Sequence, residues 1–105
     1  MTAAGVDVHS QGSTIEIRLT GEIDLANSDE VREKMFASIS NHLVAVTIDL
    51  TGLSYIDSAG LRVLFALTER LRLLQTECTM VAPVGSPTRR VLEMTGIGVV
   101  ADLKP

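Results

Sequence analysis

The sequence predicts an α/β protein, with a mixed sheet of four or five strands and three or four helices packed on it. Aromatic residues make up only 3% of a chain that is 46% hydrophobic, so aliphatic side chains have to fill the core, as they do where helices pack on a sheet. Apolar residues alternate in some stretches and recur at spacings of three and four in others. These patterns follow the order β, β, α, β, α, β, α, which predicts parallel later strands joined by right-handed crossovers.

The length and the charge of the chain limit its organisation and its partners. With 105 residues, residues 1–105 are expected to form a single domain. The formal net charge is −4 and no cluster of Lys and Arg occurs, so a nucleic-acid partner is not expected. Met1 to Asp7 do not resemble a signal peptide, and no apolar run is long enough to cross a membrane. We therefore expect a soluble, cytoplasmic protein without a membrane partner.

The chain opens with a predicted β-hairpin. Val6–His9 is expected to be a short edge strand, and the polar segment Ser10–Ser13, which contains a glycine, a hairpin turn. Thr14–Thr20 alternates polar and apolar residues throughout, which is typical of a strand with one dry and one wet face. The hairpin therefore supplies the antiparallel pair of the sheet.

A helix is predicted after the hairpin. Asn27 with Glu30 three residues later has the spacing of a capping box, and Ser28 is a second candidate for the cap. The helix is expected to run to about Ile39. Its buried face would consist of Val31, Met35, Ile39 and either Leu25 or Phe36.

The middle of the chain predicts a buried strand, a turn and a long helix. The segment Val44–Leu50 is apolar enough for a strand that is covered on both faces, and Asp49 is expected to end it by bonding nearby backbone N–H groups. The helix runs from Ser58 to about Leu74. Its buried face is predicted from the spacing to be Leu61, Leu64, Phe65, Thr68, Leu71 and Gln75. Three more apolar residues are interpreted as core, with an exposed docking surface as the alternative: Val63, Leu67 and Leu73.

The last third of the chain predicts a strand, a helix and a final strand. Cys78–Ala82 is a short strand in which the single cysteine, Cys78, is interpreted as a small buried hydrophobe. Ser86–Pro87 has the order of a helix start, and Gly96 is expected to end that helix in a left-handed conformation. Val99–Ala101 is the candidate for the last strand.

Two polar residues follow directly after predicted strands, where the functional residues of parallel sheets collect. These are Asp24 and Ser58, which we expect to be neighbours. Considered alone, Ser58 is a helix N-cap and Asp24 a turn residue. Ala59 and Gly60 are small enough to let the backbone of another protein approach Ser58.

Two stretches of the sequence resemble a known family. Asp49–Leu61 (DLTGLSYIDSAGL) resembles the signature of STAS domains, specifically of the bacterial anti-sigma factor antagonists. Leu19–Asp24 (LTGEID) resembles the family's other recognisable stretch. The resemblance covers essentially the whole chain and implies the STAS fold.

The resemblance implies a binding switch that is not an enzyme and has no cofactor of its own. In this family the unphosphorylated protein binds an anti-sigma factor that is also a serine kinase, so the sigma factor is released and transcription of its regulon, typically a bacterial stress response, begins. Phosphorylation by this kinase, which uses ATP and Mg, ends binding. A metal-dependent serine phosphatase restores the active form.

The resemblance also assigns the residues of the site. The phosphorylated serine corresponds to Ser58, Asp24 to the aspartate beside it, and Asp57 to the acidic residue before it. Arg62, one turn into the helix, is either a partner contact or a solvated charge. The predicted partner-binding residues are Asp24, Asp57, Ser58, Ala59, Gly60 and Arg62.

Other functions were compared with this one. A serine hydrolase is disfavoured because its nucleophile elbow needs glycine where the chain has Ile56, and no spacing places His9 or His42 beside Ser58. A metal site is not expected, because no His/Cys pair has ligand spacing. The main alternative is a STAS scaffold or sensor module of a larger signalling assembly, without direct sigma-factor control. It shares the fold and the serine, so it stays open at this point.

Overall fold

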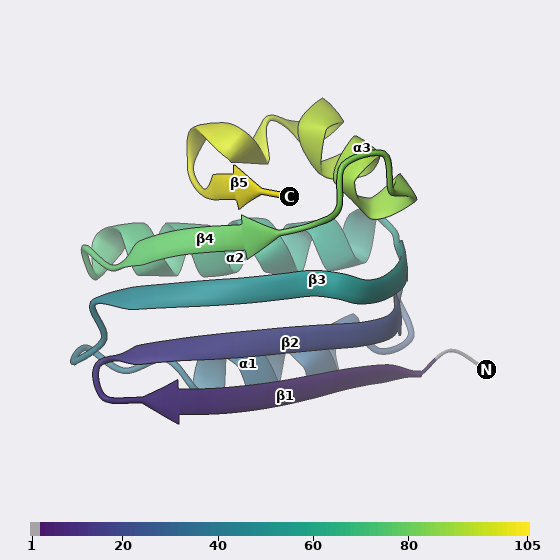
Figure 1. The fold of residues 1–105 in the computed structure, drawn as a ribbon. Helices are drawn as coiled ribbons and strands as arrows, with labels where there is room; N and C mark the ends of the chain where they lie inside the picture. The colour runs from purple at the N-terminus through teal and green to yellow at the C-terminus, as the bar shows by residue number, and fades with distance from the viewer. Residues whose placement is uncertain (1–2) are drawn as a thin grey trace.

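One five-stranded sheet organises the chain (Figure 1). The computed structural model describes residues 3–105. The elements are β1 (Ala4–Gln11), β2 (Thr14–Ile23), α1 (Ser28–Ala37), β3 (Ala45–Ile56), α2 (Ser58–Leu73), β4 (Glu77–Val81), α3 (Pro87–Thr95), a 3-10 turn η1 (Ile97–Val99) and β5 (Asp102–Lys104). The strands lie in the order β1-β2-β3-β4-β5, with β1 antiparallel to β2 and every later pair parallel. The predicted α/β class, opening hairpin and parallel later strands are confirmed.

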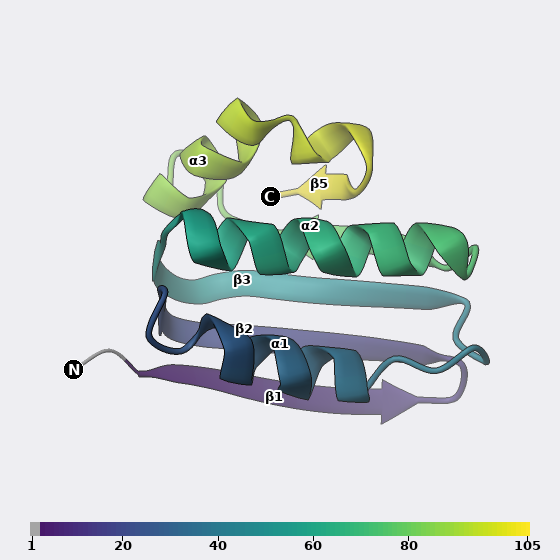
Figure 2. The ribbon, with the colours of Figure 1, turned by 180° about the vertical axis from the view of Figure 1, so that it is seen from behind.

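Helices α1 and α2 lie on the same face of the sheet, as Figures 1 and 2 show from its two sides. Each connects a strand to the next strand in the same direction across the sheet, and right-handed crossovers made in one direction place their helices on one side. The prediction that the third strand is covered on both faces is therefore wrong. Val46, Ile48 and Leu50 are buried under the helices, whereas Thr47 and Asp49 on the other face are only half-buried.

The buried face of α1 is shorter than predicted. Val31 and Met35 are buried as expected, but Leu25 is 80% exposed and is not part of the core. Phe36 is the partly buried alternative that packs against the core. The helix ends at Ala37 and not near Ile39, because the amides of the next two residues bond carbonyls three residues back.

The buried face of α2 is rotated from the predicted one. Leu64, Thr68 and Leu71 are buried as expected, while Phe65 and Gln75 are exposed. The buried residues recur at spacings of three and four: Gly60, Val63, Leu64, Leu67, Thr68 and Leu71. Val63 and Leu67 are thus confirmed as core, but Leu73 is 66% exposed, so its assignment to the core is wrong.

Strand β3 does not end at Asp49, as the sequence had predicted, but continues to Ile56. Asp49 accepts a hydrogen bond from the Thr51 N–H at 2.9 Å, as expected, without ending the strand. The strand continues because β2 also runs on, to Ile23, and pairs with the extension through two register shifts. Gly52 lies inside the strand, where a Cβ would stand 2.8 Å from the Thr20 methyl group.

The C-terminal third fits the prediction except in its last strand and in the burial of Cys78. The Ser86 side chain caps α3, accepting from the Arg89 N–H at 3.1 Å, and Gly96 ends the helix with a φ of 78°. Cys78 is only half-buried. The last strand is Asp102–Lys104 and not Val99–Ala101, because Val99 belongs to η1.

Candidate functional site

Ser58 is the first residue of α2 and is separated from the end of β3 by Asp57 alone. Its side chain is exposed. Figure 2 shows that the start of α2 lies at the same end of the sheet as the loop from β2 to α1. Parallel strands bring these two connections together because the carboxyl ends of β2 and β3 lie side by side, with Ile23 in register with Ile56.

The N-cap of α2 is Asp57, so the interpretation of Ser58 as the cap is wrong. Asp57 has an extended backbone, with φ −105° and ψ −170°, and its Oδ1 accepts from the N–H groups of Ala59 at 2.9 Å and Gly60 at 3.1 Å. Ser58 already has a helical position and follows the cap. The predicted partner-binding residue Asp57 therefore has a structural role in the chain itself.

Asp57 also joins the two loops. Its Oδ2 accepts from the Leu25 N–H at 3.2 Å, and its own N–H donates to the Ile23 carbonyl at 3.2 Å. Leu25 and Asp57 are the sequence neighbours of Asp24 and Ser58, so the predicted convergence of the two loops is confirmed.

Asp24 and Asn27 organise the loop before α1. The Asp24 carboxylate accepts from the Ala26 N–H at 2.9 Å. The Asn27 side chain turns back into this loop, accepting from the Asp24 N–H at 3.0 Å and donating to the Glu22 carbonyl at 2.9 Å. Asn27 occupies the N-cap position of α1 without a capping hydrogen bond. The predicted capping box is thus wrong, because the loop uses the Asn27 amide.

Gly60 faces the interior of the protein. A Cβ at this position would stand 2.6 Å from Ile56 Cγ1 and 2.9 Å from Ile23 Cγ2. The expectation that Gly60 lets a partner approach Ser58 is therefore replaced by an internal reason for the glycine, which lets α2 pack closely on β2 and β3. Ala59 is also buried.

A groove between α1 and α2 begins next to Ser58. Ala59 and Arg62 line it from α2, and the Arg62 side chain is exposed. Most residues that line this groove were not predicted from the sequence, among them Leu25, which was considered for the core, and Arg32 on α1. Leu25 could have been recognised from its place between Asp24 and Ala26 in a polar loop, where no helical face is available to bury it.

Charges of both signs surround Ser58, with Arg62 in the adjoining groove and two carboxylates on the joined loops. Asp24 and Asp57 lie on the two joined loops, whereas His42 precedes the start of β3 and thus lies at the opposite end of that strand from Ser58. Among residues 3–105, no group of three His, Cys, Asp or Glu side chains could hold a metal ion. Over the same residues, no helix is long and apolar enough to cross a membrane.

Comparison with known proteins gives consistent matches. A family model described as STAS domain matches residues 5–103. The anti-sigma-B factor antagonist of Listeria monocytogenes is 31% identical over 90 residues, which are 86% of this chain and 78% of that protein. The crystal structure of an anti-sigma factor antagonist from Mycobacterium paratuberculosis superposes with a TM-score of 0.86 at 25% identity, covering 98% of this chain and 86% of that one. The Bacillus cell fate determinant SpoIIAA, solved in its phosphorylated form, has the same fold, with a TM-score of 0.73 at 23% identity over 96% of this chain and 92% of that one.

Proposed function

The chain belongs to the STAS domain family, and we propose that it is an anti-sigma factor antagonist whose binding to an anti-sigma factor is switched off by phosphorylation of Ser58. Relatives that match most of the chain are named as such antagonists. The observation that supports the switch best is that Ser58 is exposed at the start of α2 while Asp57 makes the cap. The hydroxyl can therefore change without removing an interaction on which the helix depends.

A phosphate on Ser58 would be compatible with the folded chain. It would lie at the positive end of the α2 dipole, an interaction worth about 0.3 to 1 kcal/mol near a helix N-terminus. It would also bring about −1.5 to −2 charges next to the Asp57 carboxylate, so attraction by the helix and repulsion by Asp57 oppose each other. The main effect of the phosphate is then on a partner and not on the fold.

The partner would contact Ser58 together with the groove beside it. Leu25 is an exposed apolar side chain on the adjoining loop, and Arg62 is an exposed cation one turn along α2. A protein surface that packs against a neutral hydroxyl there would face a bulky dianion after phosphorylation. A loss of about 2.7 to 4 kcal/mol of binding free energy corresponds to a roughly 100- to 1,000-fold weaker complex, which is enough for a switch.

In this proposal the partners catalyse both the phosphorylation of Ser58 and its reversal. The anti-sigma factor would be the serine kinase and would bind ATP and Mg, and a metal-dependent serine phosphatase would remove the phosphate. This chain would act in the cytoplasm as a binding protein, with no cofactor and no catalytic activity of its own.

Intact mass spectrometry of the protein purified from its own host tests the modification. We expect a gain of one phosphate that phosphatase treatment removes and that fragment mapping assigns to Ser58. If no phosphate is found even after incubation with ATP and the candidate kinases of the host, the switch is refuted. The alternative, a STAS scaffold or sensor module in a larger assembly, then replaces it.

Binding measurements with the host's candidate anti-sigma factors test the effect of charge. Ser58→Ala should bind whether or not ATP is present, and Ser58→Asp should bind at least about 100-fold more weakly than the wild type. Ser13→Asp is the matched control, because Ser13 is exposed in the hairpin turn at the other end of the sheet. A folded Ser58→Asp protein that binds as tightly as the wild type would contradict the proposal.

A further inference from the structure

The two edges of the sheet differ in how well they are protected from pairing with another strand. At one edge, β5 has only three residues, includes Lys104 and is followed by Pro105; short length, lysine and proline are features that block an edge. At the other edge, β1 has eight residues, pairs with β2 without a register shift, and contains no lysine, arginine or proline. Within residues 3–105, no strand covers its outer side.

The hydrogen bonds of the hairpin define which backbone groups of β1 point outward. The Glu22 N–H donates to the Ala3 carbonyl at 3.0 Å, so Ala3 and Glu22 form a hydrogen-bonded pair. Such pairs alternate along an antiparallel ladder. The two-residue loop between Gln11 and Thr14 also makes these two residues a hydrogen-bonded pair, so the odd-numbered residues of β1 bond to β2. The backbone groups that point away from β2 therefore belong to the even-numbered residues, Ala4, Val6, Val8 and Ser10.

Val8 lies in the middle of this outward-facing set and is 40% exposed. On either side of it, Asp7 and His9 project from the open face of the sheet, because successive side chains of a strand alternate between faces. Their neighbours in register on β2 are Arg18 and Glu16. The edge thus carries an apolar residue at its centre, with acidic side chains (Asp7 and Glu16) and basic side chains (His9 and Arg18) around it.

We propose that β1 pairs antiparallel with β1 of a second copy of this chain, about a two-fold axis at Val8. This register uses the outward-facing groups of Val6, Val8 and Ser10 in both copies. It also places Asp7 opposite His9 of the other copy, twice, and an imidazole always has at least one N–H to donate to a carboxylate. The two nearest registers of the same backbone phase place Asp7 opposite Asp7 or His9 opposite His9. Like charges opposite each other are destabilising, so the central register is favoured.

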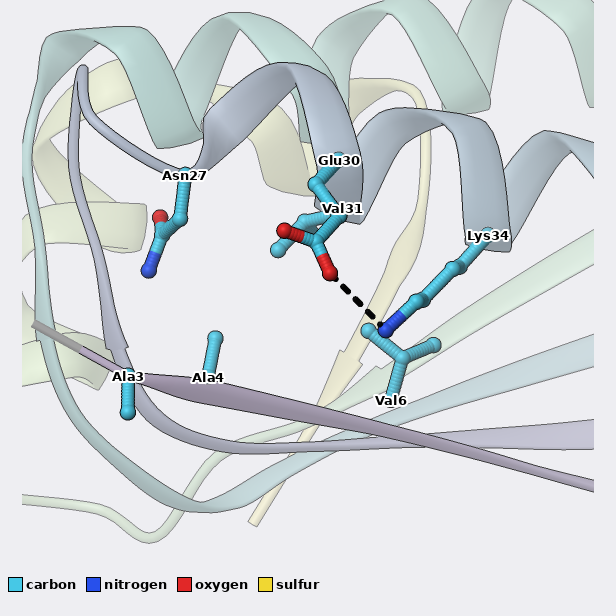
Figure 3. Close-up of a pocket in the computed structure, with 7 residues that line it drawn as sticks. All are labelled: Ala3, Ala4, Val6, Asn27, Glu30, Val31 and Lys34. Carbon is cyan, nitrogen blue, oxygen red and sulfur yellow. Dashed lines mark ion pairs between the residues drawn. The ribbon is translucent and has the colours of Figure 1, made fainter.

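A groove between β1 and α1 borders the edge that the second copy would occupy. Ala4 would lie opposite Gly12 of the other copy, in its hairpin turn. Figure 3 shows that the Ala4 and Val6 side chains point from β1 into the groove, whereas the Ala3 side chain points away from α1. On the α1 side the Glu30 and Lys34 side chains form an ion pair at 3.1 Å.

The dimer would be a continuous ten-stranded sheet, and it would leave Ser58 accessible. Helix α2 packs on β3 and β4, away from the β1 edge. The inference is therefore independent of the proposed function, and each can fail without the other.

Sedimentation velocity over a concentration series, up to about 1 mM, tests the pairing, because that range detects even weak association. We expect the wild type to reach twice the mass of one chain. Val8→Pro should weaken the dimer at least about tenfold, since it removes one outward N–H from each copy and leaves the β1–β2 ladder complete. Val8→Thr is the matched control: it keeps the N–H and the β-branch, and should dimerise like the wild type.

Charge exchange tests the register. His9→Asp places two carboxylates opposite each other at both symmetric positions and should abolish the dimer, whereas the double variant Asp7→His with His9→Asp restores opposite pairs and should recover it. Circular dichroism of each variant shows whether the monomer remains folded.

Amide hydrogen exchange on the wild type tests whether β1 pairs with a second copy, without the need for any variant. The amides of Val6, Val8 and Ser10 should gain protection as the concentration rises, while those of Asp7 and His9, bonded to β2 in either state, should stay protected throughout. The proposal is overturned if the wild type keeps the mass of one chain at about 1 mM, or if Val8→Pro dimerises equally well. Unchanged exchange at Val8 over the concentration series would overturn it too.

Discussion

Replacing Asp57 with alanine should destabilise the fold far more than replacing Ser58. The Asp57 carboxylate accepts hydrogen bonds from three backbone N–H groups, those of Ala59 at 2.9 Å, Gly60 at 3.1 Å and Leu25 at 3.2 Å. Two of these groups are the unpaired donors of the α2 N-terminus, and the third belongs to the loop before α1. Ser58→Ala leaves all three interactions in place.

The expected loss follows from these contacts. Removing an Asp cap from a helix costs about 1 kcal/mol, and removing its negative charge from the helix N-terminus costs about 0.3 to 1 kcal/mol more. The bond to Leu25 adds about 0.5 to 1.5 kcal/mol. Because these contributions overlap, we expect Asp57→Ala to lower the free energy of unfolding by about 2 kcal/mol. For a domain of this size that is a fall in Tm of roughly 10 °C.

Chemical denaturation followed by circular dichroism measures this difference. Ser58→Ala should lie within about 0.5 kcal/mol of the wild type, as surface substitutions usually do. Asp57→Asn separates these contributions: its Oδ1 can still cap the helix, but it lacks the charge and the second acceptor for the Leu25 N–H, so its stability should lie between those of Asp57→Ala and the wild type. If Ser58→Ala were as destabilising as Asp57→Ala, the assignment of the cap to Asp57 would be refuted.

Three further predictions concern single side chains. Gly60→Ala should destabilise the fold by about 1 to 3 kcal/mol, because its Cβ would stand 2.6 Å from Ile56 Cγ1; a gain in denaturation midpoint, as helix propensity alone predicts, would contradict the packing argument. At Asp49, burial raises the pKa, but the hydrogen bonds from Thr51 and the nearby Arg18 charge together outweigh it, so the folded-state pKa lies below its ordinary value of 3.8. The resulting stabilisation is present above that value and lost as the pH falls through the folded-state pKa. Asp49→Asn should thus be less stable than the wild type at pH 7 and equally stable at strongly acid pH, and a constant difference would refute this. Burial raises the pKa of the Cys78 thiol from 9.0 to about 11, so the free energy of unfolding should fall between these pH values, and less so in Cys78→Ala; native Cys78 should also react with iodoacetamide at pH 8 much more slowly than in denaturant.

The mixed sheet and the order of elements along the chain could be predicted because they depend on short-range patterns. Alternation in Thr14–Thr20 and helical spacing in Ser58–Leu71 are visible in the sequence itself. The preference for right-handed crossovers then predicts how the later parallel strands are connected. The length of β3 could not be predicted in this way. Gly52 favours a turn locally, and only the continuing pairing with β2 keeps the chain extended there.

The site was predicted in position but not in its internal contacts. The approach of the Asp24 loop to Ser58 follows from parallel pairing, whereas the cap depends on a choice between adjacent residues that both cap helices well, Asp57 and Ser58. The hydrogen bond from the Leu25 N–H, which is distant in sequence, favours a carboxylate at position 57 and so favours Asp57 as the cap. The core-facing side of Gly60 likewise depends on Ile56, a contact that becomes visible only when β3 reaches that residue.

These contacts separate stability from regulation at the start of α2. If Ser58 were the cap, a phosphate on its Oγ would replace the hydroxyl that accepts from the helix amides with a bulkier, charged group, and modification would change folding together with binding. With Asp57 as the cap, the Ser58 hydroxyl is the exposed group beside the groove and contributes little to the fold. A kinase could then alter the charge of the proposed binding surface while the carboxylate one residue earlier keeps both the helix and the Asp24 loop in place.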